Sequence, residues 1–95
     1  MKVSEITVEK VAKYLRLEEG EYTEDEIQPL IDVSKAFIRS YTGLDDEAMD
    51  MHEDFVIVVY ILCQDMYDNR TLYVDKSNLN KVVETILDMH CVNLL

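Results

Sequence analysis

The scarcity of turn-forming residues is the feature that most constrains the fold of this chain. Its 95 residues include only two glycines and one proline. A sandwich or barrel of many short strands needs frequent turns, and glycine and proline supply most of them. Apolar residues nevertheless make up 48% of the chain, which is enough to form a core. We therefore predict one all-α domain over residues 1–95, a small bundle of about four helices with a short apolar C-terminal tail.

Apolar spacing and capping residues predict two helices in the first half of the chain. Thr7 can cap a short helix, because apolar residues follow it at helical spacing. The apolar face of this short helix consists of Val8, Val11, Ala12 and Leu15. Thr23 and Glu26 have the spacing of a capping box. They precede a long amphipathic helix that Gly43 is placed to end.

Two features of the middle of the chain are ambiguous. Pro29 removes one backbone hydrogen bond from the long helix, so we expect either a kink or a later start near Gln28. The nine-residue apolar run 55–63 is rich in β-branched residues that suit a buried strand. We predict a helix, because the apolar pattern continues to Met66 and Tyr67 at helical spacing and no partner strand of similar quality exists. A helix that is apolar on all sides is the central helix of a bundle.

Two further capping signals complete the expected bundle. Asp50 and Glu53 have capping spacing before the central helix. After a loop over residues 69–78, Ser77 or Asn78 can cap a last helix. The apolar face of this last helix consists of Leu79, Val82, Val83, Ile86 and Leu87.

Negative charge excludes several function classes. Twenty acidic residues against nine basic ones give a net charge of −11. A chain of this charge repels phosphate backbones and anionic membrane surfaces. The excess lies in two groups of acids between residues 18 and 54, which we call the first and second acidic clusters. The first contains Glu18, Glu19, Glu21, Glu24, Asp25 and Glu26, and the second contains Asp45, Asp46, Glu47, Asp50, Glu53 and Asp54. Both clusters can also be read as solvated loops and helix N-termini.

The sequence contains no convincing motif for a metal ion or a cofactor. Zinc usually needs four convergent ligands in two close pairs, and His52, Cys63, His90 and Cys91 do not supply them. No EF-hand loop, glycine-rich phosphate loop or nucleophile elbow is present. We expect no metal, no cofactor and no catalytic residue. We also expect reduced thiols and no secretion signal, and the longest apolar run is too short to span a bilayer.

One enzyme alternative comes from the spacing of four acids. Glu21 and Glu24, followed by Glu47 and Asp50, resemble the paired acidic motifs with which all-α nucleotide pyrophosphatases hold Mg²⁺ on a triphosphate. Those motifs lie within helices, whereas Glu21 and Glu24 are expected to straddle a loop and a cap. No group of Lys and Arg residues is placed to bind the phosphates. The spacing can therefore arise by chance in a chain this acidic.

Residues 30–43 end in Tyr41-Thr42-Gly43, and the apolar run 55–63 leads into Asn69-Arg70. With these segments, nearly the whole chain resembles the small head–tail connector (adaptor, head-completion) proteins of tailed phages and prophages, and residues 30–43 are the most specific part. Residues 7–16 resemble the opening helix of that family, and residues 66–70 resemble its helix exit with Asn69-Arg70. Residues 83–90 are similar to its terminal helix. Pro29 departs from the family's helical pattern.

The resemblance implies a structural role without enzymatic activity. Members of this family assemble as rings of about a dozen copies beneath the portal, where they extend the DNA channel. The ring contacts the portal protein and the next tail-side component, and DNA passes through it without specific binding. Such a protein is made in the bacterial host cytoplasm and ends in the virion, at the head–tail interface. The family's C-terminal segment reaches toward the portal, which implies a docking role for His90, Cys91, Val92, Asn93, Leu94 and Leu95.

Electrostatics suggests how such a channel would work. Carboxylates on its wall repel the duplex and let it slide. We expect Asp45, Asp46, Glu47 and Asp50 to face the channel, although the same acids could face outside solvent. Lys10 and Lys13 could pair with a neighbour's acidic cluster. An alternative function for so acidic a chain is a DNA mimic that inhibits a DNA-binding protein.

Overall fold

The turn-poor chain folds as an all-α protein, as its composition predicts. The computed structural model describes residues 1–91, and no strand occurs among them. The helices are α1 (Val8–Tyr14), α2 (Glu24–Thr42), α3 (Asp46–Met49), α4 (Asp54–Asn69) and α5 (Lys81–His90), with 3-10 turns η1 (Val3–Glu5) and η2 (Lys76–Asn78). No helix in this part of the chain combines the length and apolar content needed to cross a membrane.

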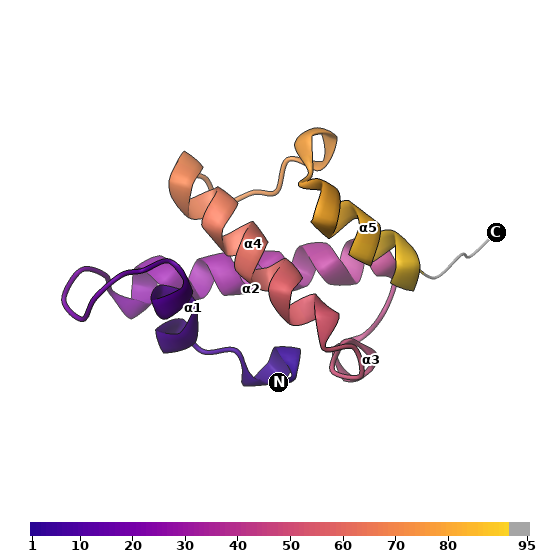
Figure 1. Cartoon of the computed structure of the whole chain (residues 1–95), viewed down its shortest axis with the longest axis horizontal. Helices are drawn as coiled ribbons and strands as arrows, with labels where there is room; N and C mark the ends of the chain where they lie inside the picture. The colour runs from indigo at the N-terminus through magenta and orange to yellow at the C-terminus, as the bar shows by residue number, and fades with distance from the viewer. Residues whose placement is uncertain (92–95) are drawn as a thin grey trace.

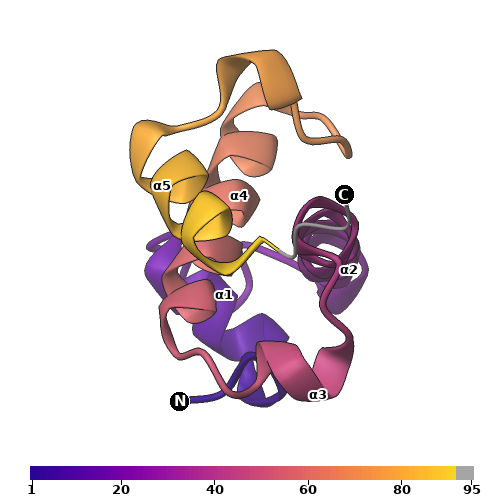
Figure 2. The ribbon, with the colours of Figure 1, turned by 90° about the vertical axis from the view of Figure 1, so that its right-hand side faces the viewer.

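Helix α4 occupies the centre of the bundle. It packs mainly against α2 and also contacts α1, α5 and η1. Figure 1 shows α4 crossing in front of the long α2, with α1 and α5 to either side. Figure 2, turned by 90°, shows α2 on one side of the molecule and α4 and α5 on the other. The β-branched run 55–63 is therefore the central helix that its apolar character predicts.

The core forms where α2 and α4 face each other. The buried residues of α2 include Ile27, Leu30, Ile31, Ser34 and Ile38. Those of α4 are Phe55, Val56, Val58, Val59, Leu62, Cys63 and Met66. Burying a large apolar side chain stabilises a fold by about 1.5–3 kcal/mol, so this seam is the main source of stability. Among the apolar side chains of α4, Ile57 is the most exposed, with 39% of its surface accessible.

Thr7 and Thr23 precede the first two helices and Gly43 ends the second, as predicted, but one predicted cap is wrong. The Thr7 hydroxyl accepts a hydrogen bond from the Lys10 backbone N–H at 3.2 Å, as expected of a cap. Thr23 does precede α2, yet its side chain makes no capping hydrogen bond. The Glu26 backbone N–H instead donates to the Thr23 backbone carbonyl at 3.1 Å. The predicted capping box is therefore wrong, although the helix starts where it indicated.

Pro29 lies within α2, so the expected later start near Gln28 is wrong. A proline inside a helix costs about 3 kcal/mol. The apolar face that begins at Ile27 and continues at Leu30 and Ile31 is almost fully buried. Burial of these three side chains, at about 1.5–3 kcal/mol each, outweighs the cost of the proline.

The approach to α4 differs from the prediction. The Asp50 carboxylate accepts a hydrogen bond from the Ser4 backbone N–H at 2.9 Å instead of capping α4. Glu53 precedes α4 and makes no side-chain cap. The short helix α3 was not predicted, and Asp45 caps it by accepting from the Ala48 backbone N–H at 2.8 Å. The carboxylates of Asp45 and Asp50 thus accept backbone hydrogen bonds that shape the chain before α4.

Helix α5 begins later than predicted. Asp75 accepts hydrogen bonds from Ser77 and Asn78, and these bonds hold both residues in the η2 turn. Asn80 caps α5 instead, through a bond from the Val82 backbone N–H at 2.8 Å. The predicted caps at Ser77 and Asn78 are therefore wrong. Leu79 consequently precedes the helix.

The apolar face predicted for the last helix is only partly correct. Val83 and Leu87 are fully buried. Val82 is 52% exposed, and Ile86 is half-buried. Helix α5 therefore buries only Val83 and Leu87, while Val82 and Ile86 form a second apolar stripe that is partly exposed to solvent.

Candidate functional site

The segment Tyr41-Thr42-Gly43, which closes the most specific segment of the resemblance, ends α2 and connects it to α5. Gly43 adopts the left-handed conformation with φ 77°, which a residue without a side chain adopts without strain. The Thr42 hydroxyl donates to the Ile38 carbonyl at 2.7 Å. The Tyr41 hydroxyl donates to the Asp88 carboxylate of α5 at 2.6 Å. This segment is therefore structural in the isolated chain.

Tyr41 has several contacts with the α5 side of the molecule. The hydrogen bond to Asp88, together with burial and the charge of that carboxylate, raises the pKa of Tyr41 to about 12. The Cys91 thiol donates to the Tyr41 carbonyl at 3.4 Å. The Lys76 ammonium lies 5.3 Å from the centre of the Tyr41 ring. These contacts fix the end of α5 against the end of α2.

The pair Asn69-Arg70 has a comparable role at the end of α4. The Asn69 side-chain amide donates to the Asp65 carbonyl at 2.8 Å. Arg70 adopts the left-handed conformation with φ 55° and ends the helix. Its guanidinium lies 5.7 Å from the centre of the Tyr67 ring. Tyr41-Thr42-Gly43 and Asn69-Arg70 are thus both explained as helix ends.

Two of the acids expected on a DNA channel have local partners around α3. Asp45 caps that helix. The Asp46 carboxylate accepts from the Arg39 guanidinium of α2 at 2.8 Å. Arg39 therefore offsets one negative charge of the second acidic cluster.

The other two expected channel acids differ from each other. Hydrogen bonds from Ser4 lower the pKa of Asp50, so this carboxylate stays ionised while it holds η1 against the chain after α3. Glu47 is exposed on α3. Of the four expected channel acids, Glu47 can therefore be changed with the least effect on the fold.

The first acidic cluster lies away from the second. All six of its residues are exposed, in the loop before α2 and in the first turn of that helix. The Glu21 carboxylate accepts from the Glu18 backbone N–H at 2.7 Å, which shapes the loop. Figure 1 shows this loop at the left-hand end of the long axis and α3 at the lower right.

The paired acids of the pyrophosphatase alternative do not come together in the structure. In residues 1–91, the only group of three or more His, Cys, Asp or Glu side chains with converging ligand atoms is His52, Asp54 and His90. Glu21 and Glu24 lie before and at the start of α2, while Glu47 and Asp50 lie around α3. The described chain therefore lacks the four facing carboxylates which that chemistry needs.

The cluster of His52, Asp54 and His90 is a feature that sequence reasoning missed. The two imidazole rings lie with their centres 4.0 Å apart, at an angle of 34°. His90 Nε2 is 2.8 Å from a carboxylate oxygen of Asp54, although 36 residues separate them in the chain. All three side chains are half-buried. No local motif could have indicated this contact, because it depends on how α5 packs against the start of α4.

The four residues that the sequence suggested as metal ligands do not form one site. Cys63 is fully buried in the core and lies 3.5 Å from the Ser34 hydroxyl. Burial raises the pKa of the Cys63 thiol to about 11, which the Ser34 hydrogen bond partly opposes. Within the described chain, no disulfide joins Cys63 to Cys91. Only His52 and His90 of the four come together.

The predicted docking tail is described only at its beginning. His90 ends α5, and Cys91 follows it at the surface. Val92, Asn93, Leu94 and Leu95 lie outside the described residues. The structure therefore bears on His90 and Cys91 alone.

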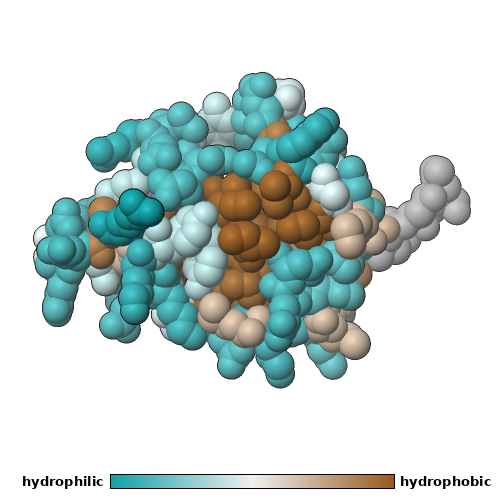
Figure 3. All heavy atoms as spheres, viewed as in Figure 1, coloured by the Kyte–Doolittle hydropathy of each residue, from teal (hydrophilic) through white to brown (hydrophobic). Residues whose placement is uncertain are grey.

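An apolar surface is exposed on the two helices α4 and α5. We call it the α4–α5 face, and its residues are Ile57, Ile61, Val82, Ile86 and Met89. Val82 is 52% exposed and Met89 69% exposed. Figure 3 shows a brown apolar patch over the middle of α4 and the neighbouring part of α5, bordered by hydrophilic residues and by residues of intermediate hydropathy. Contiguous exposed apolar surface of this kind marks interaction sites.

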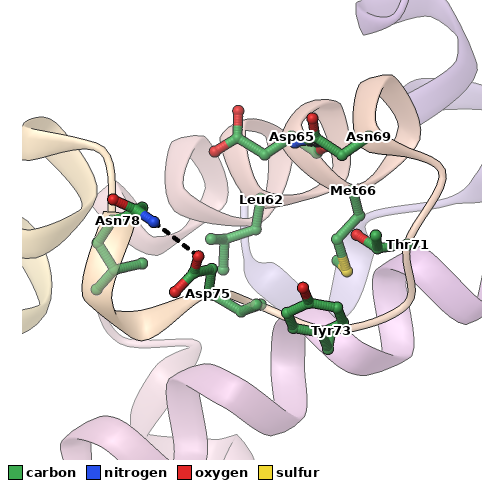
Figure 4. A pocket seen from close by; sticks show the side chains of 10 residues that line it. Leu62, Asp65, Met66, Asn69, Thr71, Tyr73, Asp75 and Asn78 are labelled. Carbon is green, nitrogen blue, oxygen red and sulfur yellow. Dashed lines mark hydrogen bonds between the residues drawn. The ribbon is translucent and has the colours of Figure 1, made fainter.

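A pocket of about 510 Å³ lies between the second half of α4 and the segment that leads to α5. Figure 4 shows Asp65, Asn69, Asp75 and Asn78 around it, with Asn78 bonded to Asp75. Burial and the neighbouring carboxylate of Asp68 raise the pKa of Asp65. The lining contains no Lys, Arg or His. This pocket therefore does not suit a phosphate-bearing ligand.

Comparison of the chain with protein-family models, with curated proteins and with solved structures finds no match.

Proposed function

We propose that this chain is a head–tail connector of a tailed phage or prophage, which assembles beneath the portal as a ring and extends the DNA channel. The observation that carries the proposal is the exposed α4–α5 face on a chain of net charge −11. The resemblance of residues 30–43 and 66–70 to that family supports it. The proposed ring needs both a surface that joins copies and a surface that repels DNA.

The α4–α5 face has the chemistry of a subunit contact. Chains with the same net charge repel one another, and burial of apolar surface between identical copies can offset this repulsion. Ile57 and Val82 are the exposed β-branched residues of this face. In a closed ring, each copy would bury this face against a different surface of the next copy.

The acids of the second cluster supply the proposed channel surface. A ring of about a dozen copies repeats each carboxylate about a dozen times around the axis. Asp45, Asp46, Glu47 and Asp50 are the proposed lining residues. Repulsion between this lining and the phosphates would keep the duplex off the wall and free to slide.

The double variant Ile57→Glu with Val82→Glu tests the assembly surface. It places two charges on the α4–α5 face and should give a folded monomer that fails to join the portal. The matched control is Ala36→Glu with Ser40→Glu, which adds the same charge at exposed positions of α2. Circular dichroism checks folding, and mass measurement with the purified portal checks assembly. Unchanged assembly of the first variant would contradict a role for this face.

The two other function classes predict different results. A DNA mimic would bind a DNA-binding protein tightly and form no ring. A pyrophosphatase would hydrolyse nucleotides with Mg²⁺ and lose that activity in Glu47→Gln. No arrangement within residues 1–91 favours either function.

A further inference from the structure

We infer that His52, Asp54 and His90 form a binding site for a divalent transition-metal ion, with Zn²⁺ as the best match. The ligand atoms of the three side chains all lie within 4.8 Å of one another. Two imidazole nitrogens and one carboxylate oxygen are a ligand set that zinc accepts, with a fourth position for water or another ligand. This inference is independent of the proposed connector function.

The geometry needs only small movements to hold an ion. Bonds of about 2.0–2.1 Å in a tetrahedral site place ligand atoms about 3.4 Å apart. His90 Nε2 and the Asp54 carboxylate oxygen are already 2.8 Å apart. An ion would enter between them and replace that hydrogen bond. A small shift of the His52 ring would then bring its ligand nitrogen, which already lies within 4.8 Å of the other two ligand atoms, to bonding distance.

The surroundings hold the two imidazoles in position. Phe55, which is fully buried, meets the His52 ring edge-on at 5.6 Å and the His90 ring edge-on at 5.0 Å between centres. Packing against a fixed aromatic ring limits the orientations of both ligands and lowers the entropic cost of binding. The neighbouring Glu53 carboxylate lies 3.4 Å from the Met1 amino group, which offsets its charge, so the negative charge that attracts a cation is mainly that of Asp54.

The site would link two helix ends. His52 lies just before α4, Asp54 is the first residue of that helix, and His90 is the last residue of α5. A bound ion would therefore hold the end of α5 against the start of α4. It would also fix the point from which the chain continues beyond His90.

Zinc chloride added to the chelator-treated full chain tests the inference. Isothermal titration calorimetry should show one ion per chain. The midpoint of thermal unfolding should rise by about 10–20 °C when free zinc exceeds its dissociation constant 100-fold. His52→Gln, Asp54→Asn and His90→Gln should each weaken binding at least tenfold and remove most of this rise. Glu53→Gln, which removes a neighbouring charge that is not a ligand, should keep most of it.

The zinc-induced shift is compared within each variant, because loss of the contact between His90 and Asp54 alters the metal-free chain too. Magnesium chloride should give no comparable shift, since Mg²⁺ prefers oxygen ligands. The inference would be wrong if the wild-type chain bound no zinc, or if His52→Gln and His90→Gln kept the full shift. An equal response to magnesium would also overturn it, because acidic residues alone would then explain the binding.

Discussion

At the scale of single residues, the positions that resemble phage connectors act as helix ends. Gly43 ends α2 and Arg70 ends α4, both in left-handed conformations. The sequence indicates that Gly43 ends a helix, because glycine at such a position follows a general rule. It does not indicate that Tyr41 bonds to Asp88, since 47 residues separate them. Local rules therefore explain where the helices end, and the packing of the bundle explains what the end residues contact.

Tyr41→Phe should lower the free energy of unfolding by about 0.5–1.5 kcal/mol at neutral pH, because it removes one hydrogen bond to a carboxylate at a partly exposed position. Asp88→Asn should cost less, since an amide oxygen can still accept from the hydroxyl. Urea unfolding followed by circular dichroism gives both values. Equal stability of Tyr41→Phe and the wild-type chain would show that this bond contributes nothing.

The difference between the wild-type chain and Tyr41→Phe should depend on alkaline pH. The pKa of Tyr41 is raised from 10.0 to about 12 in the folded chain. A group whose pKa is raised by folding stabilises the fold fully below its unfolded pKa and loses this contribution as pH rises through the folded pKa. The stability difference should therefore persist up to pH 10 and disappear by about pH 12. A difference that grew over this range would contradict the assigned hydrogen bond.

At the scale of elements, the apolar pattern predicted α1, α2, α4 and α5, whereas several expected side-chain caps were wrong about where these helices begin. Thr7 caps α1 as expected. Asp50 and Ser77 looked like caps, but they bond to Ser4 and Asp75 instead. A capping residue can accept from any N–H that the fold brings near, so the pattern alone could not distinguish these outcomes. Helix α3 was missed because four residues show no apolar period.

Leu87→Ala should lower the free energy of unfolding by about 2–5 kcal/mol, because it removes a fully buried anchor of α5. Met89→Ala, two residues further along the same helix, should change it by less than about 0.5 kcal/mol because this side chain is exposed. Thermal and urea unfolding of both variants test the pair. Similar losses in the two variants would mean that α5 does not pack as described.

At the scale of the whole molecule, the sequence did not predict the α4–α5 face or the cluster of His52, Asp54 and His90. Val82 was expected on the buried face of the last helix. In the structure α5 begins later than expected, at Lys81, and Val82 is 52% exposed. His52 and His90 come from distant segments, and only the packed bundle brings them together. The fold class follows from composition and apolar period. The α4–α5 face and the histidine cluster depend on how the helices pack against one another.

Glu47→Lys should slow DNA passage through the proposed ring, since about a dozen copies would change the charge of the channel by about 24 units. Assembly should be intact because Glu47 is exposed on α3 and caps no helix. Glu9→Lys makes the same charge reversal at an exposed position of α1 and should leave DNA passage unchanged. Packaging and ejection assays with assembled heads give the measurement. Normal passage with Glu47→Lys would remove Glu47 from the channel wall.

The mass of the complex between this chain and the portal protein of the same genome tests the central claim most directly. Native mass spectrometry of the mixture should show the portal ring with about a dozen added copies of the 11.1 kDa chain, in one defined stoichiometry. A portal ring that gains no copies, or gains them in no fixed number, would contradict the account of this chain as a connector.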